Sequence, residues 1–114
     1  MTMPKPQPVT ASIVLNESPP FAIGDTVTFT TVVPKLKGSA YPLVYLKATV
    51  DGEVVYGQLD YPSAAFLLGG GSSPWIDPAN PHYRQPAICV AELWAYGGPK
   101  GEQRLASTEE FPAG

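Results

Sequence analysis

Cysteine and histidine are almost missing from this sequence, with one residue of each in a chain of 114. A single cysteine cannot form an internal disulfide. A zinc site needs several ligands, which Cys89 and His82 cannot supply by themselves. The glycines at 69–71 are not followed by the Lys-Ser or Lys-Thr pair of a phosphate-binding loop. We therefore predict no disulfide, no metal centre and no cofactor.

Positive charge is also scarce, because the chain has seven Lys and Arg residues, spread singly, and a formal net charge of −3. Without a basic stripe, we expect no binding to nucleic acid. The longest apolar run is far shorter than the roughly 20 residues that span a bilayer, so no membrane segment is predicted. The first residues, MTMPKPQPVT, lack the apolar core of a signal peptide. We therefore expect synthesis in the host cytoplasm without a signal peptide.

Proline and glycine are abundant instead, with 14 Pro and 11 Gly in the chain, which is typical of many turns and few helices. Proline alternates at Pro4, Pro6 and Pro8, and this alternation favours extended backbone. We predict an extended N-terminal arm over residues 1–8, followed by a single domain over residues 9–114.

Alternating and β-branched segments predict about seven strands and no helix. The clearest signal is Asp51-Gly52, a favoured two-residue hairpin turn, which predicts that Val50 faces Glu53 and that Ala48 faces Val55. In the segment AICVAELWAY, alternation predicts that Cys89 lies on the buried face, with Trp94 and Tyr96 on the opposite face. The predicted strands are 10–15, 26–33, 43–50, 53–60, 63–68, 87–96 and 103–111.

The order of these segments resembles an immunoglobulin-like or fibronectin-type domain. The resemblance is carried by a Thr-rich second strand, the central hairpin and a closing hairpin, CVAELWAY followed by RLASTEEF. It covers about residues 9–112 and implies an all-β, two-sheet β-sandwich. The second core cysteine and the core tryptophan of antibody domains are missing, because Trp94 falls on the face opposite Cys89. The resemblance is therefore not to an antibody-type domain.

As a free, leaderless, Pro- and Gly-rich single domain, the chain also looks like small immunoglobulin-like virion proteins of tailed phages that infect actinobacteria. This resemblance implies a non-enzymatic structural subunit of the virion, which decorates the capsid or the tail surface. Its partners would be other virion proteins, such as the major capsid or tail protein, and homo-oligomerisation is left open. The alternative is a carbohydrate- or host-surface-binding module that uses Trp75, Tyr83 and Trp94 as stacking platforms.

The long segment GGGSSPWIDPANPHYRQP, residues 69–86, is the main candidate site. Its Trp75, Tyr83 and Arg84 are of the residue types enriched at interface hot spots, and its prolines reduce the entropy lost on docking. We predict that this loop and the N-terminal arm contact a neighbouring subunit. For Trp75, the alternative is that the side chain folds back and caps one end of the domain.

Two tyrosines form a second candidate patch, because Tyr45 and Tyr56 are assigned to the outer face of the central hairpin. Catalysis is not predicted. The 69–86 loop holds the residue types of a hydrolase triad at Ser72, Ser73, Asp77 and His82, but no strand–turn–helix elbow presents a serine. The strand carboxylates, Asp60, Glu92 and Glu109, are assigned to exposed positions.

Overall fold

The computed structural model describes residues 10–99 and 101–114, so the predictions for Pro4, Pro6 and Pro8 lie outside the described residues. The described chain is all-β, as predicted, with one short 3-10 helix and no helix long and apolar enough to cross a membrane. The elements are β1 (Ser12–Leu15), β2 (Thr26–Val27), β3 (Phe29–Val32), β4 (Tyr41–Val50), β5 (Glu53–Asp60), β6 (Phe66–Leu67), η1 (Pro74–Ile76), β7 (Ala87–Gly98), β8 (Gly101–Ser107) and β9 (Phe111–Ala113).

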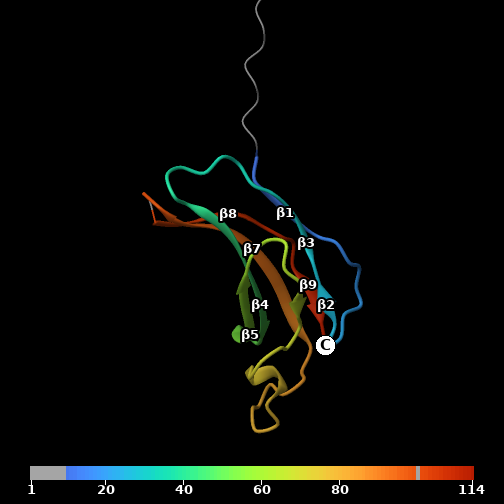
Figure 1. Ribbon diagram of the computed structural model, residues 1–114. Coiled ribbons are helices and arrows are strands. Elements are labelled where there is room, and N and C mark those ends of the chain that lie inside the picture. The colour runs from blue at the N-terminus through green and yellow to red at the C-terminus, as the bar shows by residue number, and fades with distance from the viewer. Residues whose placement is uncertain (1–9, 100) are drawn as a thin grey trace, which may run out of the picture.

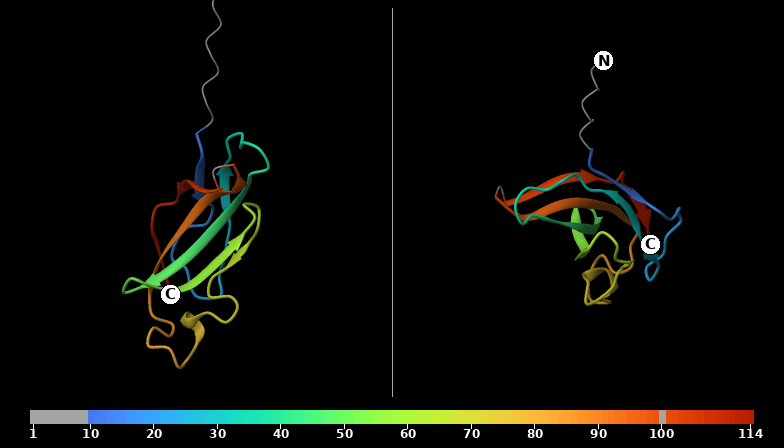
Figure 2. Two further views of the ribbon diagram at one scale, coloured as in Figure 1. Left: turned by 90° about the vertical axis from the view of Figure 1, so that its left-hand side faces the viewer. Right: turned by 45° about the horizontal axis from the view of Figure 1, so that its top comes forward.

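The largest sheet is five-stranded and antiparallel, with the order β5-β4-β7-β8 and with β9 also paired to β7. Two smaller ladders pair β1 with β3 and β2 with β6. The small sheets face one side of the large sheet, while the loop that contains η1 lies at one end of the molecule (Figure 1, Figure 2). The large sheet therefore has an inner face, turned toward the small sheets, and an outer face.

The core lies against the inner face of the large sheet. On β7, alternation buries Cys89, Ala91 and Leu93, which confirms the predicted burial of Cys89. The corresponding side chains of β4 and the facing small sheets complete one apolar cluster. Its largest fully buried members include Val27, Val44, Leu46, Phe66 and Leu68.

The structure divides two of the predicted strands, so residues 10–99 and 101–114 hold nine strands where about seven were expected. The segment 26–33 breaks at Thr28, and its two halves pair with different partners, β6 and β1. At the break, the Thr28 amide and hydroxyl donate to the two carboxylate oxygens of Glu17, at 2.7 and 2.6 Å. These hydrogen bonds take the place of strand pairing at Thr28, so β2 and β3 can pair with different strands. The last predicted strand, 103–111, is likewise divided into β8 and β9.

The central hairpin forms at the predicted turn, where Asp51 and Gly52 have φ angles of 51° and 81°. Its register is correct next to the turn and wrong beyond it, because a β-bulge between Ala48 and Thr49 places Ala48 opposite Tyr56 instead of Val55. The bulge turns two consecutive side chains of β5, Val55 and Tyr56, into the core. Burying both apolar groups explains the shift of register.

Candidate functional site

Trp75 of the 69–86 loop is fully buried, so the prediction that it contacts a partner is wrong and the capping alternative is confirmed. Its indole N–H donates to the Gln85 carbonyl at 2.8 Å, and its ring centroid lies 6.2 Å from that of Tyr56. The ring packs so closely on the backbone that a Cβ at Gly114 would lie 3.2 Å from it. The loop therefore completes the core at the end of the β4–β5 hairpin.

Hydrogen bonds within the loop fix the shape of its remaining part, and one side-chain contact joins it to β5. Arg84 adopts a φ of 53°, and its N–H donates to the Trp75 carbonyl at 2.7 Å. The Asn80 side-chain oxygen accepts from the His82 amide at 2.8 Å, and His82 Nε2 lies 3.1 Å from Glu53 Oε2. The single histidine thus attaches the loop to the start of β5.

The remaining predicted site residues do not assemble into one site. Tyr83 and Arg84 are exposed on the loop, Tyr45 is half-buried on the outer sheet face, and Tyr56 is buried in the core. The outer-face assignment of Tyr56 is therefore wrong, because the β-bulge turns it inward. Asp77 accepts a hydrogen bond from its neighbour Ala79 at 3.0 Å, whereas the His82 ring faces Glu53 and Gln85. No hydrogen bond joins the proposed triad among the described residues.

The outer face of the large sheet carries an aromatic cluster that the sequence reading did not assemble. β4 and β7 pair so that Tyr41 faces Tyr96, Leu43 faces Trp94, and Tyr45 follows two positions along the same face. The ring centroids of Tyr41 and Tyr96 are 6.4 Å apart and those of Trp94 and Tyr96 are 6.3 Å apart. We call these side chains, Tyr41, Tyr45, Trp94 and Tyr96, the aromatic floor.

Two glycines leave room for rings of the aromatic floor against the backbone. A Cβ at Gly57 would lie 2.8 Å from Tyr45 Oη and 3.3 Å from its Cζ, so the Tyr45 ring lies over the bare glycine. A Cβ at Gly97 would lie 3.1 Å from Tyr41 Cε1. These two glycines therefore accommodate the rings of Tyr45 and Tyr41 against the backbone.

Glu92 links the aromatic floor to a polar depression beside it. Its carboxylate is buried, contrary to the predicted exposure; it accepts from Trp94 Nε1 at 3.3 Å and from Arg104 Nη1 at 3.2 Å. The depression has a volume of about 540 Å³. We call it the polar groove, and its lining is Lys47, Thr49, Ile88, Val90, Glu92, Arg104 and residues 107–110.

The tyrosines of the floor share one electrostatic environment. The pKa of Tyr96 is raised, first by burial and then by the nearby carboxylates of Glu102 and Glu92 and the hydroxyls of Tyr41 and Tyr45. The Tyr96 hydroxyl therefore keeps its hydrogen at neutral pH and gives the floor a hydrogen-bond donor.

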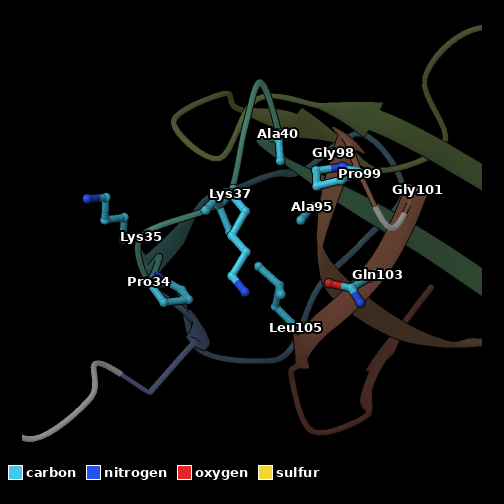
Figure 3. Close-up of a pocket in the computed structure, with 11 residues that line it drawn as sticks. Pro34, Lys35, Lys37, Ala40, Ala95, Gly98, Pro99, Gly101, Gln103 and Leu105 are labelled. Carbon is cyan, nitrogen blue, oxygen red and sulfur yellow. The ribbon is translucent and has the colours of Figure 1, made fainter.

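A separate cavity of about 230 Å³ lies between the 34–40 connection and the β7–β8 turn (Figure 3). Its walls are mainly apolar, with Pro34, Pro99 and Leu105 among them. Lys37 extends toward Leu105, whereas Lys35 points away (Figure 3). The described residues of the lining include no carboxylate, and its mainly apolar walls suit a small apolar group.

Comparison of this chain with protein-family models, with curated proteins and with solved structures finds no match. The functional proposal therefore depends on the resemblance seen in the sequence, on the surfaces of the large sheet and on the 69–86 loop.

Proposed function

We propose that this chain is a non-enzymatic structural subunit of a phage virion, which decorates the capsid or the tail surface through contacts with other virion proteins. The virion assignment is supported by the resemblance of the whole chain to small immunoglobulin-like virion proteins. The contact surface is supported by one structural observation, the exposed apolar edge of the large sheet formed by β5.

The finer fold assignment belongs to the same proposal, an immunoglobulin-like β-sandwich of the fibronectin type. Thr28 alone separates β2 from β3, which supports a single layer built from the β1–β3 and β2–β6 ladders. The five-stranded sheet is the other layer, in which β8 and β9 both pair with β7. Two antiparallel layers packed face to face are what such a sandwich requires.

The proposed contact surface for a partner is the edge of the large sheet formed by β5. Among the described residues, β5 pairs with β4 on one side and with no strand on the other. Along it, Val54 is 51% exposed and Leu59 is 49% exposed, and Tyr61, just after the strand, is 65% exposed. Natural proteins usually protect such an edge with charges, prolines or a covering segment. An exposed apolar edge instead marks a surface that a partner covers.

The 69–86 loop extends this surface at one end of the molecule. The His82–Glu53 contact holds the loop at the start of β5, and the two residues that follow His82, Tyr83 and Arg84, are exposed. Tyrosine and arginine are enriched at interface hot spots. Because the loop is already held by its own hydrogen bonds, little conformational entropy is lost when a partner binds.

The test is the incorporation of variants into virus particles when the variant is the sole source of the subunit. Val54→Lys is expected to reduce the copies per purified particle roughly tenfold or more, because it buries a charge in the contact. Val14→Lys is the matched control, since Val14 is also a strand valine, 58% exposed, but lies on β1. Equal incorporation of both variants would contradict the β5 contact, and absence of the wild-type chain from particles would contradict the virion assignment.

A second candidate function, carbohydrate binding, is favoured by a different observation. The aromatic floor lies on the outer sheet face and uses none of the three residues that define the β5 edge. Leu59 of β5 lies opposite Tyr45 on this face, so a protein contact on β5 and a ligand site on the floor would adjoin each other.

A further inference from the structure

The aromatic floor gathers four aromatic side chains on the outer face of the large sheet. Gly57 lets the Tyr45 ring lie on the backbone, and Gly97 gives Tyr41 a similar position. Tyr41 and Tyr96 are inclined by 27° to each other, which is close to parallel. Trp94 and Tyr96 are inclined by 48° to each other, and Tyr41 is 47% exposed. The floor is therefore a broad apolar surface that is open to solvent.

The polar groove next to the floor has the opposite chemistry. Its lining includes the Lys47 ammonium, the Arg104 guanidinium and the Glu92 carboxylate. The hydroxyls of Ser107 and Thr108 belong to the same lining. Together these groups supply both donors and acceptors of hydrogen bonds. The Glu92–Arg104 ion pair stands at the boundary, because Trp94 of the floor donates to the same carboxylate.

A pyranose ring needs this combination of surfaces. Its axial C–H groups form an apolar face that stacks on an aromatic ring, while its hydroxyls point outward in the ring plane and require hydrogen-bond partners. An apolar protein segment would instead cover Lys47 and the Glu92–Arg104 pair without offering them hydrogen-bond partners, which is costly. We propose that the aromatic floor and the polar groove together form a binding site for a polysaccharide chain. This inference rests on the proposed function, in which a subunit on the virion surface meets the glycans of the host envelope.

The size of the surface favours a chain of sugars over a single sugar. From Tyr96 to Ile88, β7 runs along the floor and then along the groove, a length of about 26 Å at the usual rise of a strand. The ligand is thus an extended saccharide whose rings stack at the Tyr96 end and whose hydroxyls are bound near Arg104 and Lys47.

The experiment is native gel electrophoresis of the full chain in gels that contain dissolved glucan, mannan, galactan or polysaccharide extracted from host envelopes. At least one polysaccharide is expected to retard the wild type. Trp94→Ala should weaken this binding at least tenfold. Gly57→Ala should weaken it as well, although all rings remain, because the new Cβ displaces Tyr45. Tyr83→Ala, which removes an exposed tyrosine outside the floor, is the control and should bind as the wild type does.

A second measurement needs no variant and so does not depend on the folding of one. The chain has two tryptophans, and Trp75 is fully buried, so a change of tryptophan emission on adding the retarding polysaccharide reports Trp94. The inference is overturned if no polysaccharide retards the wild type, or if Trp94→Ala and Gly57→Ala are retarded as strongly as the wild type. It is also overturned if floor variants lose incorporation into particles, because the floor would then be a protein contact. Saccharide binding by a chain that is absent from particles would instead contradict the proposed function alone.

Discussion

Replacing Trp75 with alanine tests whether the 69–86 loop is part of the core. Trp75 is fully buried, and its indole N–H is bonded to the Gln85 carbonyl. Removing a buried tryptophan side chain costs about 3–5 kcal/mol, and the unpaired carbonyl adds about 1 kcal/mol. We expect Trp75→Ala to lower the free energy of unfolding by about 4–6 kcal/mol, which is a large part of the roughly 5–15 kcal/mol typical of a domain.

The assay is equilibrium unfolding in urea followed by far-UV circular dichroism, with Trp94 fluorescence as a second probe. Trp75→Phe keeps most of the ring and loses the indole donor, so its loss should be smaller, about 1–3 kcal/mol. Tyr83→Ala is the control on the same loop, because that exposed side chain should change stability by less than about 0.5 kcal/mol. A Trp75→Ala protein within about 1 kcal/mol of the wild type would refute the capping role.

Three further predictions concern the turn, the thiol and the strand break. Gly52→Val should cost about 1–3 kcal/mol in thermal unfolding, because Gly52 has a φ of 81°; an unchanged Tm would contradict the turn. Burial raises the pKa of Cys89 to about 11, so native labelling at pH 8 should be at least roughly 100-fold slower than in urea. Labelling at equal rates would place the thiol at the surface. Burial alone would raise the pKa of Glu17, but the hydrogen bonds from Thr28 outweigh it and lower the pKa below its usual 4.5. The Glu17 carboxylate therefore stabilises the fold above about pH 4.5, and this contribution is lost as the pH falls through the lowered pKa. Glu17→Gln should flatten that part of the pH–stability curve. A variant curve identical to that of the wild type would contradict the hydrogen bonds between Thr28 and Glu17.

Local chemistry made the central hairpin predictable, but only close to its turn. Asp51 and Gly52 both adopt the positive φ that a type I′ turn requires, and this preference depends on the two residues themselves. The register farther along depends on the bulge, which is favoured because Val55 and Tyr56 both gain burial. That gain comes from the packing of the whole core and is not visible in the hairpin segment alone.

The sequence predicted the face of the two aromatic side chains that β7 contributes to the floor, but not the side chains that join them from β4. Alternation along 87–96 placed Trp94 and Tyr96 on the face opposite Cys89, and the structure confirms this arrangement. Tyr41 and Tyr45 join them only because β4 pairs with β7 across a long stretch of sequence. Strand pairing between distant segments follows from tertiary packing, so the four rings could not be assembled from the sequence.

In the 69–86 loop, residue types that are common at interfaces are found both in the core and at the surface. Tryptophan, tyrosine and arginine are enriched at interfaces, and large aromatic side chains also dominate cores. Trp75 is buried because η1 folds back onto Tyr56, whereas Tyr83 stays exposed eight positions later. The choice depends on the space beneath the β4–β5 hairpin, which only the folded chain defines.

The most direct test of the proposed virion role is quantitative mass spectrometry of phage particles purified through successive density gradients. The account predicts that peptides of this chain remain with the particles at a constant copy number relative to the major capsid protein. Peptides that are abundant in the lysate but disappear from the particles during purification would contradict it.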